Sequence, residues 1–297
     1  MRISIAVLIL MVLATACGVA TSSTSTSPPA EVPTASIPLE ASPTATPFVP
    51  SPTPPPLAAE VNGEGITMAE YQAELARFRA ASGTGMATYG EEKVLEDMID
   101  QLLMAQAAYE AGFVVDEQLV QKRIDQLNVG EGALTEWLAA HGYTEATFRE
   151  ALARAIAAAW LRDQVAGQVP ETADQVHARQ ILRYTAEEAN EVYAELESGV
   201  DFETLAAEYA PLTQGDLGWF PRGYLSEPAL SEAAFSLEPG AYSSVIETRL
   251  GYHILQVLDR ETQRPLTFDA RQVLQLQALN EWLQEFRDQS EINILVP

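Results

Sequence analysis

The sequence predicts an α+β fold, in which a helical body carries a small domain with a mostly antiparallel sheet and surrounding helices. Three observations lead to this class. Residues 68–165 repeat apolar side chains at helical spacing. Residues 176–258 alternate short strand patterns with short helical patterns. Residues 270–288 return to helical spacing. Such separated runs are typical of α+β proteins or of two domains.

Composition limits the possible functions. The chain has 297 residues, enough for two domains, with 42 acidic and 17 basic residues and a formal net charge of −25. This charge argues against nucleic acid as a partner, because phosphate binding needs a basic surface. The single cysteine, Cys17, permits no internal disulfide. His141, His177 and His253 are far apart in sequence, which disfavours a metal site.

The first residues indicate export. A basic start is followed by an apolar run too short to span a bilayer, so residues 1–16 are predicted to be a signal peptide. Small residues before Cys17 resemble a lipobox, which makes Cys17 the predicted lipid attachment site. The expected location is extracytoplasmic, on the cell membrane at the cell surface or in the periplasm. Ordinary secretory cleavage, with Cys17 incidental, is the alternative.

Residues 17–57 are rich in Ser, Thr and Pro and cannot bury a core, so they are predicted to form a disordered tether. A helical domain is expected over residues 58–170. Its first helix begins after Thr67, with Glu70 completing a capping box. The expected helices are Met68–Ala80, Glu91–Gly112, Asp116–Leu127, Leu134–Ala140 and Glu145–Val165.

A second domain is expected over residues 174–262. The expected elements are, in order, a strand Val176–Leu182, helices Ala186–Glu197 and Phe202–Tyr209, a glycine-punctuated loop Gly215–Phe220 with a short strand as its alternative, a helix Glu227–Phe235, and strands Val245–Arg249 and Tyr252–Leu258. Residues 267–297 then supply a helix, Ala270–Asp288, and a strand, Ile292–Val296. The helix has an apolar stripe, so this segment is expected to pack on the N-terminal domain.

Four ordered motifs in the second domain resemble parvulin-type peptidyl-prolyl isomerases: Ala178–Leu182, Gly215–Phe220, Ala233–Gly240 and Gly251–Leu255. Residues 61–67 and 95–116 resemble the SurA-like N-terminal domain of secreted foldases of the SurA and PrsA type, a chaperone module. The resemblance implies isomerisation of X-Pro bonds, which needs no cofactor or metal. It also implies that unfolded or newly secreted polypeptides are partners, and that the C-terminal segment returns to pack on the N-terminal module.

The resemblance assigns candidate site residues. The polar set is His253, Gln180 and Thr248, with Gln180 standing where the family has a second histidine. His177 is expected on the opposite strand face from Gln180. The loop of residues 210–214 is short and has no Cys or Asp, unlike the family pattern. The proposed proline-binding residues are Leu217, Leu225, Leu230 and Phe235, with core packing an equal alternative for Phe235.

Two functions remain open from the sequence. One is an active prolyl isomerase and chaperone at the membrane surface. The other is a non-catalytic holdase whose parvulin domain only binds extended chains, which Gln180 and the short loop favour. A third and weaker hypothesis is a lipoprotein that recruits one specific partner.

Overall fold

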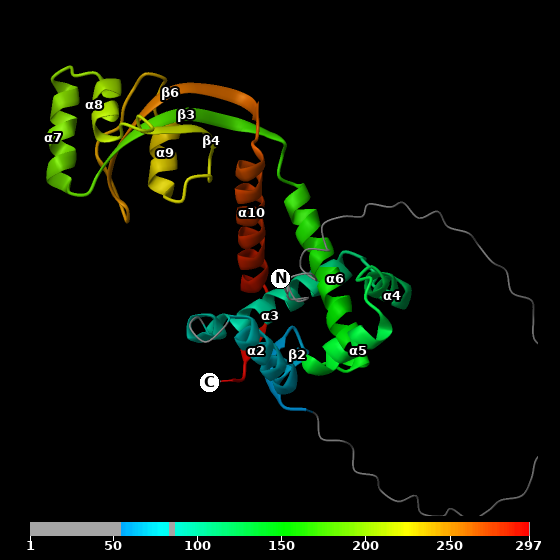
Figure 1. Ribbon diagram of the computed structural model, residues 1–297. Helices are drawn as coiled ribbons and strands as arrows, with labels where there is room; N and C mark the ends of the chain where they lie inside the picture. The colour runs from blue at the N-terminus through cyan, green and yellow to red at the C-terminus, as the bar shows by residue number, and fades with distance from the viewer. Residues whose placement is uncertain (1–54, 83–86, 297) are drawn as a thin grey trace, which may run out of the picture. The chain divides into compact units, whose positions relative to one another are not determined.

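The computed structural model describes residues 55–82 and 87–296 (Figure 1). The predicted signal peptide, Cys17 and all but the end of the predicted tether lie outside the described residues. The described residues divide into two compact units, one of residues 55–82, 87–98 and 293–296 and the other of residues 99–292. Both helices and antiparallel strands are present, so the predicted α+β class is confirmed.

The first unit contains a three-stranded sheet in the order β2-β1-β7. Its elements are β1 (Leu57–Val61), β2 (Glu64–Thr67), α2 (Met68–Ser82) and β7 (Ile292–Ile294). Asn62 and Gly63 join β1 to β2 with φ angles of 52° and 83°. Positive φ at both central residues suits the twist of a two-residue hairpin, and Asn-Gly is the sequence that adopts it most easily.

The start of α2 shows why the sequence could locate it. The backbone N–H of Glu70 donates to the Thr67 hydroxyl at 3.2 Å, and the backbone N–H of Thr67 donates to the Glu70 carboxylate at 2.8 Å. These reciprocal bonds satisfy two amide groups that a helix end leaves without partners. The predicted capping box is therefore confirmed.

The second unit holds the remaining helices of the body. They are the C-terminal part of α3 (Ala87–Glu110), α4 (Glu117–Asp125), α5 (Glu131–Ala140), α6 (Glu145–Gly167) and α10 (Phe268–Asp288). Alanines of α3 and α6 allow these helices to approach closely, and Trp282 and Phe286 of α10 pack against the same cluster. Helix α10 thus buries part of its apolar stripe on α6, while Leu276 stays 62% exposed.

A four-stranded sheet, in the order β4-β3-β6-β5, forms the centre of the region that carries the candidate site. Its strands are β3 (Thr172–Arg183), β4 (Asp216–Pro221), β5 (Ile246–Thr248) and β6 (Gly251–Pro265), and every paired neighbour is antiparallel. Two expectations need revision here. The segment described as a loop with a strand as its alternative is strand β4, because it pairs with β3. Strand β6 continues past Leu258, because its polar second half pairs with the start of β3.

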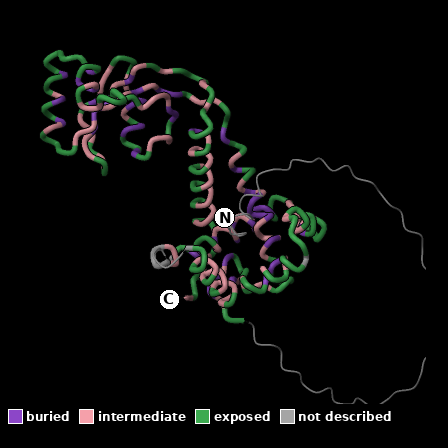
Figure 2. The backbone as a smooth tube through the Cα atoms, viewed as in Figure 1, coloured by how far each residue is buried: buried purple, intermediate pink, exposed green. Residues whose placement is uncertain are grey.

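Helices cover both faces of this sheet. They are α7 (Ala186–Glu197), α8 (Phe202–Tyr209) and α9 (Pro228–Ser236). Figure 1 labels these helices near the strands, and Figure 2 shows buried residues in this part of the chain. Helix α9 packs on the face that includes Ala178 and Leu255. Helices α7 and α8 pack on the face that includes Ile181 and Ile254. The alternation of strand side chains therefore separates two cores, and the residues that follow lie on the α9 face.

Candidate functional site

Three polar side chains meet on the α9 face of the sheet, and we call them the polar trio: Gln180, Thr248 and His253. The Nδ1 atom of His253 lies 2.8 Å from Oε1 of Gln180, and its Nε2 atom lies 2.9 Å from Oγ1 of Thr248. Strand register brings them together, because Leu182 pairs with His253 while Gln180 is two residues away on the same face. The structure therefore unites the three polar residues named from the sequence.

The hydrogen bonds specify one form of the His253 ring. A carbonyl oxygen only accepts, so Nδ1 carries the proton and donates to Gln180. The other nitrogen then accepts the hydroxyl proton of Thr248. Burial lowers the pKa of His253 below its ordinary value, and the negative charge of Glu227 offsets part of that effect. The ring is thus held neutral, in one tautomer, at neutral pH.

The exposure of His253 limits what it can do. Its relative exposure is 1%, and both ring nitrogens are occupied by Gln180 and Thr248. Gln180 and Thr248 are half-buried and therefore reach solvent. Gln180 and Thr248 thus offer polar groups to solvent, whereas the His253 imidazole lies beneath them.

Gly215 fixes the backbone of Gln180. The N–H of Gln180 donates to the carbonyl of Gly215 at 2.8 Å. Gly215 has a φ of +70°, and a Cβ atom there would lie 2.0 Å from the carbonyl oxygen of Gln180. Only glycine allows so close an approach. The turn before β4 is therefore held against the strand that carries Gln180.

The predicted proline-binding leucines belong to the core on the same sheet face as the polar trio. Leu217 and Leu225 are half-buried, whereas Leu230 is buried. We call these three residues the leucine group. They pack around Ala178 and Leu255, so the leucine group and the trio share one face of the sheet.

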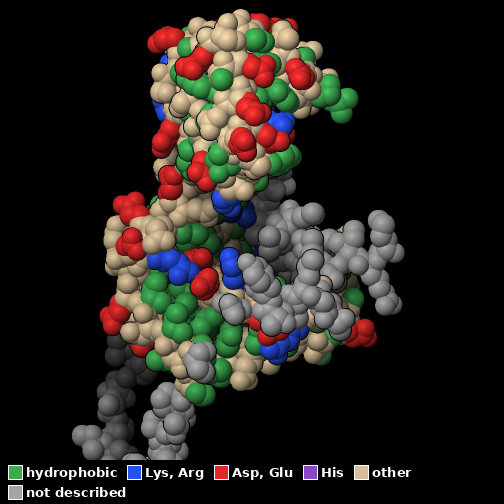
Figure 3. Space-filling model, turned by 90° about the vertical axis from the view of Figure 1, so that its left-hand side faces the viewer, with side chains coloured by type: hydrophobic (Ala, Val, Ile, Leu, Met, Phe, Trp, Pro, Cys, Tyr) green, Lys and Arg blue, Asp and Glu red, His purple; other side chains and the backbone are tan. Residues whose placement is uncertain are grey.

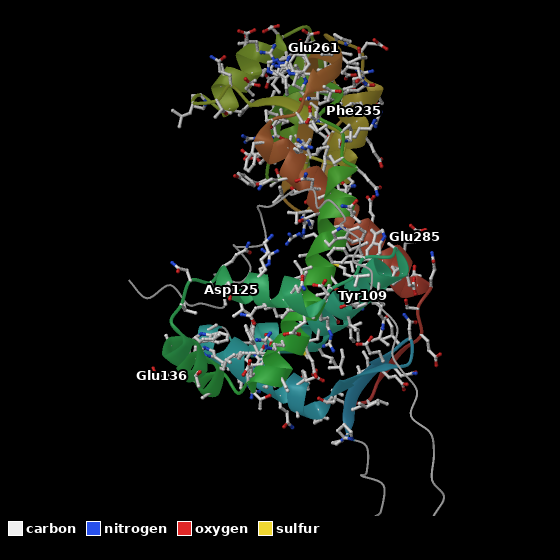
Figure 4. The ribbon with its side chains drawn as sticks, turned by 90° about the vertical axis from the view of Figure 1, so that its right-hand side faces the viewer. Tyr109, Asp125, Glu136, Phe235, Glu261 and Glu285 are labelled. Atoms are coloured by element: carbon white, nitrogen blue, oxygen red, sulfur yellow. The ribbon has the colours of Figure 1, made fainter. Side chains whose placement is uncertain are left out.

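Phe235 of α9, labelled in Figure 4, belongs to the same buried cluster as Leu230. It is buried, meets Phe220 edge to face at 6.4 Å, and has the guanidinium of Arg222 4.2 Å from its ring centre. Arg260 also donates to the Phe235 carbonyl at 2.9 Å. These contacts enclose the ring and suit the core-packing interpretation of Phe235.

Asp216 supports the turn that presents Leu217. One carboxylate oxygen accepts from the N–H of Gly218 and contacts Nε2 of His177, both at 2.8 Å. Partial burial alone would raise the pKa of Asp216, but the Gly218 amide and His177 together lower it below its ordinary value. His177 thus lies away from the polar trio, in a structural pair that the sequence did not predict.

One charged pair near the site was also missed from the sequence. Glu227, directly before α9, accepts from Arg249 in the turn between β5 and β6, with Nε and Nη2 each 2.8 Å from Oε1. The residues are 22 positions apart and no local pattern links them. From the sequence, Glu227 is placed only as the first residue of a helix, with no signal for its pairing with Arg249.

Acidic clusters, metal-holding groups and membrane-spanning helices in the described part of the chain would indicate other kinds of site. Acidic side chains are spread across the visible face in Figure 3 rather than gathered into one cluster. Over residues 55–82 and 87–296, no group of three or more His, Cys, Asp or Glu side chains is placed to hold a metal ion. Among the same residues, no helix is long and apolar enough to cross a membrane.

Two family models match the chain. The SurA-like N-terminal domain matches residues 2–162, which is more than half of the chain. The PPIC-type PPIase domain matches residues 169–259, which include the polar trio and the leucine group. The two matched segments follow one another without overlap.

Curated relatives agree with both models. The foldase protein PrsA of Caldanaerobacter subterraneus subsp. tengcongensis is 27% identical over 230 residues, covering 67% of this chain and 72% of its own length. The chaperone SurA of Methylobacillus flagellatus is 33% identical over 147 residues, covering 42% of this chain and 33% of its own length. The match thus spans about a third of the length of this SurA relative.

Solved structures include a similar chain. The peptidylprolyl isomerase PrsA from Bacillus anthracis has a TM-score of 0.46 and 22% sequence identity, covering 66% of this chain and 96% of its own.

Proposed function

The chain belongs to the family with a SurA-like N-terminal domain and carries a PPIC-type peptidyl-prolyl isomerase domain, and on this basis we propose that it isomerises X-Pro bonds in client chains. The family is that of PrsA- and SurA-type foldase chaperones. The proposed clients are unfolded or newly secreted polypeptides. The observation that carries the proposal is the polar trio on the same sheet face as the leucine group.

Isomerisation of an X-Pro bond requires only rotation about the peptide bond. Rotation about the peptide bond faces a barrier of about 18–20 kcal/mol, and no covalent bond is made or broken. A site accelerates rotation when it binds the twisted amide better than either planar form. We propose that the leucine group holds the proline ring, with Phe235 supporting it from the core. Gln180 and Thr248 would then contact the amide, with His253 as a positioning residue that acts through them.

A protease-free exchange measurement on a short X-Pro peptide tests this proposal. The wild-type chain should accelerate cis/trans exchange in proportion to its concentration. Gln180→Leu removes the group that the buried His253 Nδ1–H donates to, which costs about 1–3 kcal/mol. We expect kcat/KM to fall about tenfold in this variant. Wild-type exchange at the uncatalysed rate would refute the isomerase proposal.

One observation favours a holdase as the second candidate function. His253 is buried, and the residue beside it is Gln180, an amide that does not titrate. A holdase would suppress aggregation of an unfolded client while leaving peptide exchange unchanged. Measuring both activities on one preparation separates the candidates, because a holdase keeps the first activity and lacks the second.

The cellular location is a further proposal. We infer that the chain is exported and anchored at the extracytoplasmic membrane surface through a lipid on Cys17. Mass spectrometry of the mature protein tests this, and Cys17→Ser provides the control. An unmodified Cys17 in protein released to the medium would contradict the anchor.

The domain division is proposed in the same terms. Residues 58–170 would form the chaperone-like domain, residues 174–262 the isomerase domain, and residues 267–297 the segment that returns to the first domain. The packing of α10 on α6 and the pairing of β7 with β1 support this division. Limited proteolysis should cut first near residues 168–171 and 266–267, which lie outside the paired strands, if the division is correct.

A further inference from the structure

A charged pair joins the two halves of the candidate site. The side chain of Glu227 is 11% exposed and that of Arg249 is 78% exposed. Both Nε and Nη2 of Arg249 donate to the same oxygen of Glu227 at 2.8 Å. A carboxylate this buried needs a charged partner, because leaving it unpaired would cost several kcal/mol.

The two residues of the pair lie in different parts of the candidate site. Glu227 lies between Leu225 and Leu230 of the leucine group, at the N-cap of α9. Its side chain makes no capping bond to the helix and turns to Arg249 instead. Arg249 directly follows Thr248, whose hydroxyl contacts His253.

The turn that carries Arg249 is itself tied to the polar trio. The N–H of Leu250 donates to the Thr248 hydroxyl at 3.0 Å, and that hydroxyl lies 3.2 Å from the carbonyl of Gly251. A shift of Arg249 would therefore move the hydroxyl that holds Nε2 of His253. The ion pair is the charged link between this turn and the segment that begins α9.

An ordinary surface ion pair is the competing explanation. Exposed pairs contribute about 0–1 kcal/mol and leave a neighbouring site unchanged. The pair of Arg264 and Glu261, at 2.7 Å with side chains 33% and 48% exposed, is of that kind. It joins residues three apart on one strand and provides a matched control in the same domain.

We propose that Glu227 and Arg249 form a clasp of positioning residues, which sets the distance between the leucine group and the polar trio and so determines how tightly the site holds a prolyl peptide. This inference rests on the proposed function. The clasp acts on the site's geometry, so its effect falls on peptide binding and on the His253 ring together.

The test is a double-mutant cycle on the full chain with Glu227→Gln and Arg249→Gln. NMR titration with a short X-Pro peptide gives the binding constant, and the ring signals of His253, recorded at a pH where the ring is neutral in every variant, report the geometry. Each single variant should weaken binding about three- to tenfold and shift the His253 signals. The double variant should be no weaker than the singles, because both remove one interaction. Glu261→Gln should change neither measurement.

Several outcomes would overturn the clasp. Effects of the two variants that simply multiply would show that the residues act independently. Unshifted His253 signals, or an equal effect from Glu261→Gln, would show an ordinary surface pair. Wild-type binding without faster exchange would refute only the isomerase proposal, whereas a wild-type chain that binds no prolyl peptide would refute both.

Discussion

Replacing Gly215 by alanine should displace the strand segment that carries Gln180. A Cβ atom at residue 215 would lie 2.0 Å from the Gln180 carbonyl oxygen, whereas ordinary contact begins at 3.4 Å. The turn must therefore retreat by about 1.4 Å. That movement breaks the 2.8 Å bond from the Gln180 N–H to the Gly215 carbonyl.

Two contributions determine how far Gly215→Ala lowers the free energy of unfolding. A non-glycine residue in the left-handed region costs about 1–2 kcal/mol. The lost backbone hydrogen bond adds about 0.5–1.5 kcal/mol. We therefore expect Gly215→Ala to lower the free energy of unfolding by about 1.5–3.5 kcal/mol.

Gly218 supplies the matched control, because its φ is +67° and nothing lies within 4 Å of the Cβ position. Gly218→Ala should cost only the backbone term, about 1–2 kcal/mol. Urea unfolding, with native-state hydrogen exchange of the β3 amides, measures both variants. Equal costs for the two substitutions would refute the steric reasoning, as would unchanged His253 ring signals in Gly215→Ala.

Three further predictions concern the same domain. Burial lowers the pKa of His253, so the unfolded chain takes up a proton before the folded chain does as the pH falls below the ordinary value of 6.5. The free energy of unfolding should therefore decline below this pH. His253→Gln should remove that decline in a pH series of urea titrations. Leu230→Ala should cost about 2–5 kcal/mol by thermal unfolding, whereas Leu212→Ala, 98% exposed, should change stability by less than about 0.5 kcal/mol. Thr248→Val should destabilise by about 1–3 kcal/mol while Thr248→Ser does not, and a nitrogen spectrum of His253 that is identical in both would contradict the assigned tautomer.

Local signals in the sequence located many of the helices. The side chains of Thr185 and Asp201 cap two helices, which begin and end as predicted, at Ala186–Glu197 and Phe202–Tyr209. Capping is decided within one helical turn, so the residues that determine it are neighbours in the sequence. Helix α5 begins three residues before the predicted Leu134, because Gly130 provides no side-chain cap to mark its start.

Strand pairing was harder to predict for a physical reason. The residues of β4 were expected to form a loop, with a strand as the alternative, because Gly215 and Gly218 interrupt them. Pairing with β3 makes them a strand, and that pairing joins residues about 40 positions apart. The polar end of β6 likewise has no apolar alternation and is a strand only because β3 lies beside it.

The candidate site likewise combines residues that sequence motifs identified with a pair that only the folded chain brings together. The resemblance to parvulins named Gln180, Thr248 and His253, and the fold brings them within hydrogen-bonding distance. Their roles in catalysis remain predictions. The pair of Glu227 and Arg249 has no sequence signal, because a turn and a helix start become neighbours only after the sheet has formed.

The pairing of β1 with β7 has a consequence for biogenesis. Strand β1 comprises Leu57–Val61, and its neighbour β7 comprises Ile292–Ile294, at the other end of the sequence. A chain that is synthesised with its N-terminus first has β1 exposed as a sheet edge until residues 292–294 have been made. The first unit therefore completes its sheet only after the whole second unit has been synthesised, and the chain is prone to aggregate through β1 until then.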